Sequence, residues 1–315
     1  MKISLAPLQG YTDWVFRRAY QKYIGGVDEF YTPFLVLQNG GDLKTAHKRE
    51  VEPFSEKSDN LIPQFLCGSV EEMSFFESYF SDLGYSKMNW NLGCPYPMVT
   101  KRGKGSGLLP YPEKIGNIIT EGFKDKIELS IKMRLGLTDG NEIHEVLKAL
   151  DQFNIKEIII HPRIGKQLYK GTANREKFAQ LYNEYGKKFA YNGDINSCQD
   201  FEVLSKEIPC LNHLMIGRGI LKDFWLPHKI KGLELPTDSE RKIILKKVHD
   251  EIYETYSSYL SGDNQVLQKV KPFWEYFSCH FETERKVYKA IKKASGLKKY
   301  EQAVSFAFSQ NLKED

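Results

Sequence analysis

The stretch Ile127-Glu128-Leu129-Ser130-Ile131-Lys132-Met133-Arg134-Leu135 decides which fold we expect. Apolar and polar residues alternate through it, and side chains alternate between the two faces of a β-strand. One face is therefore apolar, whereas the other face carries Glu128, Ser130, Lys132 and Arg134. The two cations stand at the C-terminal end of their face, where a buried charge needs a partner. We expect an anionic ligand to supply that partner.

Short apolar runs like this one recur along the chain, each followed by a helix-like stretch. They predict strands near residues 3–8, 29–36, 61–66, 87–93, 127–135, 157–163, 188–195 and 213–219. Strands that alternate with helices in this way, over about 235 residues, predict a (β/α)₈ TIM barrel. The alternative is a doubly wound open sheet, but Pro7-Leu8-Gln9-Gly10 lacks the Gly-rich turn that usually follows its first strand.

The segment 232–240 reads as a boundary, because the strand signals stop after it. It contains a Gly, a Pro and a T-x-x-E capping box from Thr237 to Glu240. Helices are predicted at 239–261, 265–279, 282–294 and 298–310. We therefore expect a barrel domain over residues 1–237 and an all-helical domain over residues 238–315.

Composition permits several classes of function and makes others improbable. Hydrophobic residues make up 41% of the 315-residue chain and charged residues 27%, which is ordinary for a globular protein. The net charge of +4 permits a nucleic-acid partner without requiring one. No apolar run of about 18 residues occurs and no signal peptide is seen, so we expect no membrane span and a cytoplasmic location.

Polar side chains and glycines end several of the predicted strands, which is where barrel enzymes place their chemistry. They are Gln64, Asn89, Asn91, His161, Arg163, Asn192, Asp194 and Arg218. Gly193 and Gly217 end the last two strands, whose loops often bind phosphate in barrels. Glycine lets backbone N–H groups approach a ligand closely. The alternative for either glycine, taken alone, is a simple chain turn.

The five cysteines are interpreted in two ways. Their odd number and the absence of C-x-x-C predict neither a disulfide framework nor a zinc site, and we expect no metal. Cys94 stands in a strand-end loop beside cations and amides, so it is a candidate for reactivity. We interpret the others as inert core residues: Cys67, Cys198, Cys210 and Cys279. The loop 101–107 that follows Cys94 is basic; it is either a lid or RNA-backbone contact, or a solvated turn.

Together these residues resemble the tRNA-dihydrouridine synthase family over nearly the whole chain. The matching pieces are Ala6-Pro7-Leu8-Gln9-Gly10-Tyr11-Thr12-Asp13, Gln64, Asn91-Leu92-Gly93-Cys94-Pro95, Gly105-Ser106-Gly107-Leu108-Leu109, Ile131-Lys132-Met133-Arg134, His161-Pro162-Arg163, Asn192-Gly193-Asp194-Ile195 and Met215-Ile216-Gly217-Arg218-Gly219. The chain departs from the family pattern at Leu8, where methionine is more usual, at Pro97 and Met98, where lysines are common, and at Pro162, a frequent glycine.

The resemblance implies FMN as cofactor and a role for each matching residue. The isoalloxazine ring would be bordered by Pro7, Leu8, Gln9 and Gln64 and contacted by Lys132 and His161. The ribityl chain and phosphate would be held by Asn192, Gly193, Asp194, Gly217 and Arg218. Cys94 would give a proton to C5 of a flipped-out uracil while C6 receives a hydride, and the uracil would be placed by Asn91, Arg134 and Arg163. NADPH is the implied reductant; because no dinucleotide-binding fingerprint occurs, we expect it to visit only transiently.

Transfer RNA is the implied partner, and the C-terminal cations are its candidate contacts. From Arg285 to Lys299 there are seven cations and no acidic residue. At helical spacing Arg285, Lys289 and Lys292 share a face, and the other face carries Val287, Ile291 and Ala294. The alternative is a simply solvated face. Lys101 and Arg102 are further candidate RNA contacts. We expect a monomer, although no residue pattern determines the oligomeric state.

Two rival functions stay open at this stage. One is an FMN barrel that reduces a free pyrimidine, similar to dihydroorotate dehydrogenase, which would not need the basic helical domain. The other is a catalytically inactive barrel that only binds RNA, which would be colourless when purified. Neither rival predicts both a flavin and a requirement for residues 238–315.

Overall fold

The structure, a computed structural model, describes residues 1–38, 40–52, 60–185 and 189–313. The packing of the chain divides it into two compact units. The first unit comprises Met1–Pro7, Asp28–Ile195 and Asp200–Ile216, and the second comprises Leu8–Val27, Asn196–Gln199 and Gly217–Asp315. The division does not follow a single cut in the sequence, so the expected domain boundary at residue 237 stays a prediction.

The first unit is a barrel of parallel strands. They are β1 (Lys2–Leu5), β2 (Glu29–Tyr31), β3 (Leu61–Ile62), β4 (Gln64–Phe65), β5 (Lys87–Leu92), β6 (Glu128–Gly136), β7 (Ile158–Ile164), β8 (Phe189–Tyr191) and β9 (His213–Ile216). Their order is β3-β2-β1-β9-β8-β7-β6-β5-β4, and all neighbours are parallel. The two end strands are consecutive pieces of one segment interrupted at Pro63, so the sheet returns on itself. The predicted barrel fold is thereby confirmed.

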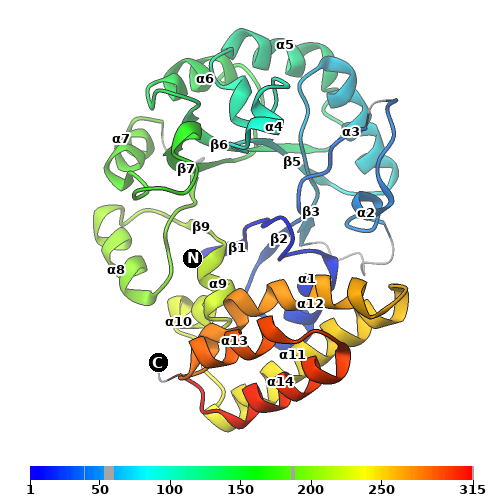
Figure 1. The fold of residues 1–315 in the computed structure, drawn as a ribbon. Helices are drawn as coiled ribbons and strands as arrows, with labels where there is room; N and C mark the ends of the chain where they lie inside the picture. Colours follow the sequence, from blue (N-terminus) through cyan, green and yellow to red (C-terminus); the bar gives the residue numbers. More distant parts are fainter. Residues whose placement is uncertain (39, 53–59, 186–188, 314–315) are drawn as a thin grey trace. The chain divides into compact units, whose positions relative to one another are not determined.

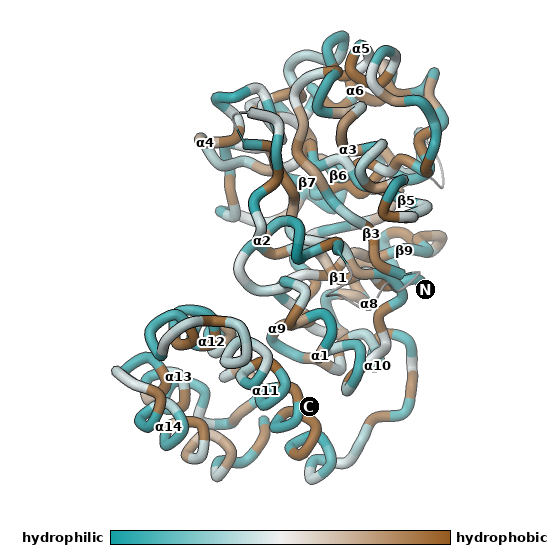
Figure 2. Tube along the Cα trace, turned by 90° about the vertical axis from the view of Figure 1, so that its right-hand side faces the viewer, coloured by the Kyte–Doolittle hydropathy of each residue, from teal (hydrophilic) through white to brown (hydrophobic). Residues whose placement is uncertain are grey.

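Helices surround these strands in the first unit, as the outer ribbons of Figure 1 show. They are α3 (Val70–Asp82), α5 (Pro112–Gly122), α6 (Glu142–Leu150), α7 (Arg175–Tyr185) and α8 (Cys198–Glu207). Shorter segments are α2 (Thr45–Lys48), α4 (Pro97–Thr100), η1 (Gly105–Leu108) and η2 (Gly165–Gln167). Apolar residues run along strands such as β3 in the hydropathy view (Figure 2), as expected for strands covered on both faces.

The strands differ from the predicted ones mainly at their C-terminal ends. The predicted strand 213–219 stops at Ile216, because Gly217 becomes the N-cap of a helix that begins at Arg218. The predicted strand 188–195 stops at Tyr191, and its first residue lies outside the described residues. Both strands therefore end earlier than the apolar pattern suggests. Residues 192–194 lie on the loop after β8, whereas Gly217 caps α9 and Arg218 is its first residue.

The second unit is helical. It contains α1 (Trp14–Tyr23), α9 (Arg218–Lys222), α10 (Leu226–Lys231), α11 (Asp238–Tyr259), α12 (Asp263–Phe277), η3 (Ser278–His280), α13 (Glu284–Lys293) and α14 (Leu297–Ser309). The predicted capping box is confirmed: Glu240 N–H donates to Thr237 Oγ1, and Thr237 N–H donates to Glu240 Oε2 over 2.8 Å. An aromatic core that includes Trp274 and Tyr300, joined by an indole-to-hydroxyl hydrogen bond of 3.0 Å, holds the last four helices together.

The α1 helix belongs to this second unit although it follows β1 directly in the sequence. Arg18 Nη2 lies 2.9 Å from Glu251 Oε1 of α11, and the Tyr256 hydroxyl donates to Asp13. Asp13 is also the N-cap of α1, since its side chain accepts from Phe16 N–H. One carboxylate therefore both begins α1 and anchors it to α11. None of the helices in the described part of the chain has both the length and the apolar character that a membrane crossing requires.

Candidate active site

The barrel interior of the first unit is layered, and its layers identify which side chains face inward. One buried cluster is formed by five strand residues and one residue directly after β1: Tyr31, Ile62, Ile159, Ala190, Met215 and Ala6. Lys132 lies in register with Ile159 on one side and Asn91 on the other, so all three side chains share the inner face. The polar face predicted for residues 127–135 is thus the interior face of the barrel.

Lys132 is a desolvated cation. Burial, followed by the nearby Arg134 guanidinium, lowers the pKa of Lys132 to about 7. Among the described residues no carboxylate acts on this ammonium group, and the only opposing influence comes from Cys94. Lys132 is half-buried by its exposed surface. A desolvated lysine without an acidic partner favours an anionic or strongly accepting ligand beside it.

Cys94 lies in the loop after β5, close to these cations. Its side chain is buried, with 6% of the residue exposed, and burial raises the pKa of the thiol although Arg134 and Lys132 act in the opposite direction. The thiol is therefore protonated near neutral pH and suits a proton donor more than a nucleophile. Cys94, Lys132 and Arg134 are brought together, as the sequence predicts.

A chain of buried side-chain amides on β4 and β5 positions the Cys94 loop. Asn91 Oδ1 accepts the backbone N–H groups of Gly93 and Cys94, both over 2.9 Å. Asn91 Nδ2 donates to Gln64 Oε1 over 2.7 Å, and Gln64 Nε2 donates to Asn89 Oδ1 over 2.7 Å. The side-chain amides of Asn91 and Gln64 therefore bind each other, and Asn91 also binds the Cys94 loop. The ligand contacts expected for these two residues stay predictions.

Ser106 holds the same loop from the other side, and the sequence analysis did not single it out. Its backbone N–H and its hydroxyl both donate to the Cys94 carbonyl, over 3.0 and 3.1 Å. Gly105 has a positive φ of 57°, and a Cβ there would lie 2.6 Å from the same carbonyl oxygen. The clustered Gly105-Ser106-Gly107 was the available signal, since closely spaced glycines often mark close backbone approach.

Arg134 also binds backbone around the cysteine. Its Nε donates to the Gly93 carbonyl over 3.0 Å and its Nη1 to the Ile164 carbonyl over 2.9 Å. Its guanidinium carbon lies 5.5 Å from the centre of the Tyr169 ring, in a cation–π arrangement. Arg134 therefore ties the end of β7 to the loop after β5, and a contact with uracil stays a prediction.

The end of β7 and the loop after β8 are joined by an ion pair between a buried arginine and a half-buried aspartate. Arg163 contacts both oxygens of the Asp194 carboxylate and also His161 Nε2. Asp194 has a positive φ of 41°, unusual for a residue other than glycine, and its carboxylate also accepts Ala173 N–H over 2.8 Å. These contacts bring three predicted site residues together.

The predicted phosphate loops fall in different units. Pro7, Asn192 and Gly193 belong to the first unit, where Asn192 Nδ2 donates to the Met215 carbonyl over 2.7 Å. Leu8, Gln9, Gly217 and Arg218 belong to the second unit, which is described separately. Their convergence on one phosphate therefore stays a prediction. Packing alone also favours glycine at position 193, because a Cβ there would lie 2.8 Å from Ala173 Cβ.

The predicted basic surfaces are only partly solvated. Lys101 and Arg102 are exposed, but residues 105–107 of the same loop are buried in η1, and Lys104 pairs with Glu72. In the second unit the seven cations of the 285–299 stretch are exposed, while Val287, Ile291 and Ala294 are buried. The expected division of α13 into a cationic and an apolar face is confirmed.

The interpretation of the four remaining cysteines as core residues is correct only for Cys67. Cys210 is exposed, and Cys198 and Cys279 are half-buried. Cys210 follows α8 just before β9, and Cys198 begins α8, so both stand at element ends near the surface. All five cysteines have free thiols.

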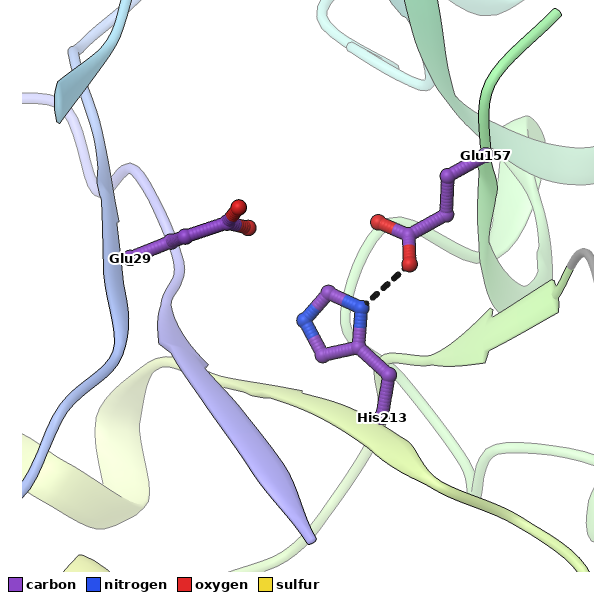
Figure 3. Close-up of side chains that lie close together, drawn as sticks. All are labelled: Glu29, Glu157 and His213. Carbon is purple, nitrogen blue, oxygen red and sulfur yellow. Dashed lines mark hydrogen bonds and ion pairs between the residues drawn. The ribbon is translucent and has the colours of Figure 1, made fainter. Parts of the chain in front are cut away.

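The opposite, N-terminal end of the barrel holds a second polar group (Figure 3). Donor atoms of Glu29, Glu157 and His213 lie within 4.8 Å of one another. His213 Nδ1 lies 2.6 Å from Glu157 Oε1, and its Nε2 lies 2.6 Å from Ser4 Oγ. Lys2 Nζ lies 2.8 Å from Glu29 Oε2 and so supplies a cation to the group. At this end of a barrel such networks generally serve stability.

A parallel barrel that brings a proton-bearing thiol and a desolvated lysine to its C-terminal mouth is typical of a barrel enzyme. Comparison with known proteins makes the class specific. The family model described as Dihydrouridine synthase (Dus) matches residues 4–313. The chain belongs to the dihydrouridine synthase family and is a flavin-dependent oxidoreductase.

Curated relatives agree with the family assignment. A probable tRNA-dihydrouridine synthase of Helicobacter pylori is 31% identical over 277 residues, covering 84% of this chain and 79% of the relative. One of Staphylococcus epidermidis is 28% identical over 258 residues, with 80% and 78% covered. The tRNA-dihydrouridine(16) synthase of Cupriavidus necator is 25% identical over 257 residues, with 78% and 79% covered.

Solved structures show the fold alone. A 2-naphthoyl-CoA reductase in complex with 2-naphthoyl-CoA has a TM-score of 0.51 at 11% sequence identity. The match covers 74% of this chain and 50% of that chain.

Proposed function

We propose that this protein reduces the C5–C6 double bond of a uridine in tRNA, with FMN as its bound cofactor and NADPH as the transient reductant. The observation that carries the proposal is the meeting of Cys94, Lys132 and Arg134 at one mouth of the barrel. The similarity to relatives whose names state tRNA-dihydrouridine synthase activity supports the substrate.

The residues at the mouth fit a flavin. Lys132 is desolvated without an acidic partner among the described residues, and an isoalloxazine ring that becomes anionic on reduction would supply one. Lys132 and His161 would contact the ring, with Gln64 and Pro7 at its border. Asn192 and Asp194, together with Gly193, Gly217 and Arg218, would hold the ribityl phosphate, and Leu8 and Gln9 would complete the border. Bound FMN supplies a hydride for carbon–carbon double-bond reduction.

The protein's own groups would complete the reduction by moving a proton and holding the base. The Cys94 thiol would give its proton to C5 of the uracil, and its raised pKa keeps that proton in place at neutral pH. Lys132 would stabilise negative charge on the reduced flavin, and Arg134 or Asn91 would stabilise the developing enolate oxygen of the uracil. Asn91 and Ser106 would hold the thiol in place, because both bind the Cys94 backbone.

Transfer RNA would be bound through phosphate contacts. The exposed cations of the second unit, Arg285, Lys289 and Lys292 among them, favour an anionic partner, and Lys101 and Arg102 would add contacts from the first. A monomer in the cytoplasm is the state we propose for this reaction.

The test separates the two halves of the reaction. The purified protein should be yellow, and Cys94→Ala should still lose its flavin absorbance on addition of NADPH. Formation of dihydrouridine in tRNA should fall about 100-fold or more, because the general acid is gone. Cys210→Ala, which removes an exposed thiol just before the N-terminal end of β9, is the matched control. Undiminished tRNA reduction by Cys94→Ala, or a colourless protein, would contradict the proposal.

A further inference from the structure

A continuous hydrogen-bonded chain links β7 to the loop after β8 in the barrel unit. Arg163 Nη1 lies 3.0 Å from His161 Nε2 and 3.1 Å from Asp194 Oδ1, while Nη2 lies 2.5 Å from Asp194 Oδ2 and 2.7 Å from the Gly171 carbonyl. The Arg163 side chain is 2% exposed. A bidentate carboxylate and a carbonyl therefore orient the guanidinium, and the oriented guanidinium presents one N–H to the imidazole.

The direction of that last hydrogen bond follows from chemistry alone. An arginine side chain has five N–H donors and no acceptor, and it does not lose its proton in proteins. His161 Nε2 must therefore be the acceptor, and an acceptor nitrogen carries no proton. The ring then holds its single proton on Nδ1.

We propose that Arg163 is a positioning residue that holds His161 as the neutral, Nδ1-protonated tautomer, and that Asp194 orients Arg163 for this task. A change to the other tautomer, or protonation of Nε2, would place two N–H donors face to face in a buried site. Loss of that hydrogen bond opposes both states, and like-charge repulsion from the guanidinium further opposes the doubly protonated ring.

The charges around His161 act in the same direction. Arg134 of β6 lies in register with His161, and the Tyr169 ring centre is 6.4 Å from the imidazole. The charged groups beside the imidazole include Arg163 of β7, Arg134 as its register partner on β6, and Lys132 on the same face of β6. Asp194 acts through Arg163, which contacts both of its carboxylate oxygens.

The role of the fixed His161 tautomer in catalysis rests on the proposed function. If His161 contacts the flavin, a neutral Nδ1–H ring can donate one hydrogen bond without adding a positive charge beside Lys132. This changes the expected role of Arg163. Its Nη1 and Nη2 groups are engaged by His161, Asp194 and Gly171, so the structure favours a role through His161 over direct uracil contact.

The experiment reads the imidazole directly and needs no cofactor. Full-length protein, freed of flavin and RNA and labelled with ¹⁵N-histidine, is studied by long-range ¹H–¹⁵N correlation. His161→Gln identifies the signals of this ring among the seven histidines of the chain. In the wild type we expect a pyridine-like Nε2 and a pyrrole-like Nδ1 with no titration between about pH 6 and 8.

Variants of Arg163 then test whether this residue fixes the His161 tautomer. In Arg163→Met the ring should exchange between its two neutral tautomers, because the donor that fixes Nε2 as an acceptor is gone. Arg163→Lys keeps a donor but loses the bidentate grip, so the tautomer preference should be partly retained. Arg175→Met, which removes a half-exposed arginine paired with Glu207 over 3.3 Å, is the control and should leave the His161 signals unchanged. Circular dichroism confirms that each variant is folded.

Two results would overturn the inference. One is an Nε2-protonated or doubly protonated His161 in the wild type near neutral pH, which decides the matter even if Arg163→Met does not fold. The other is a folded Arg163→Met with unchanged His161 signals. Because neither measurement involves flavin or tRNA, the proposed function stands or falls separately on the flavin spectrum and on dihydrouridine formation.

Discussion

Replacement of Lys132 by methionine should stabilise the cofactor-free protein, although Lys132 is proposed to serve catalysis. Burial lowers the pKa of this lysine from 10.5 to about 7. Each unit of pKa difference between the folded and unfolded states corresponds to about 1.4 kcal/mol. The difference therefore represents a folding penalty of about 5 kcal/mol at most for the charged lysine. We expect Lys132→Met to raise the unfolding free energy by about 2–4 kcal/mol, because methionine does not fill the lysine site perfectly.

The pH dependence of this gain follows from proton binding. Between about pH 7 and 10 the unfolded chain keeps the Lys132 proton while the folded chain has released it. The wild type therefore becomes more stable relative to Lys132→Met as the pH rises through this range. The advantage of the variant should be full at and below about pH 7 and should have largely disappeared near about pH 10.

The assay is urea unfolding of the flavin-free wild type and variant at several pH values, with Lys156→Met as the control. Lys156 is exposed and pairs with Glu128 over 3.2 Å, so its replacement should change stability by about 0.5 kcal/mol or less at every pH. If Lys132→Met is less stable than the wild type near neutral pH, or if the difference does not shrink with rising pH, the description of Lys132 as an unpartnered, desolvated cation is refuted.

Three further predictions concern a cap, a surface and a turn. Thr237→Ala should lower the unfolding free energy by about 1 kcal/mol, whereas Thr237→Ser, which can still accept from the N3 amide, should retain most of it in urea titrations. The triple change of Arg285, Lys289 and Lys292 to glutamine should weaken tRNA binding at low salt and reduce the slope of log K against log salt by about 2–3; an unchanged slope would remove this face from the interface. Gly193→Ala should cost about 1–3 kcal/mol of stability, because its Cβ would lie 2.8 Å from Ala173 Cβ; a melting temperature equal to that of the wild type would refute this packing argument.

Much of the fold could be read from local pattern. Alternation of side chains located β6 to within a residue at each end, and the apolar face of α13 was placed correctly on Val287 and Ile291. The cap at Thr237 was readable because its partner Glu240 is only three residues away. Strand ends such as Ile216 were less accurate, because the residues beyond them stay apolar or small while the backbone already turns into a helix.

What the sequence determined by itself is the set of elements, the polar inner face of β6 and, through the resemblance, the family. Only the tertiary structure decided what each site residue contacts. Arg163 meets Asp194 31 positions away, and Ser106 meets Cys94 12 positions away, because parallel strands bring their C-terminal ends to one edge of the barrel. The burial that keeps the Cys94 thiol protonated and depresses the pKa of Lys132 arises from that convergence, since desolvation depends on every neighbour in space and not on neighbours in sequence.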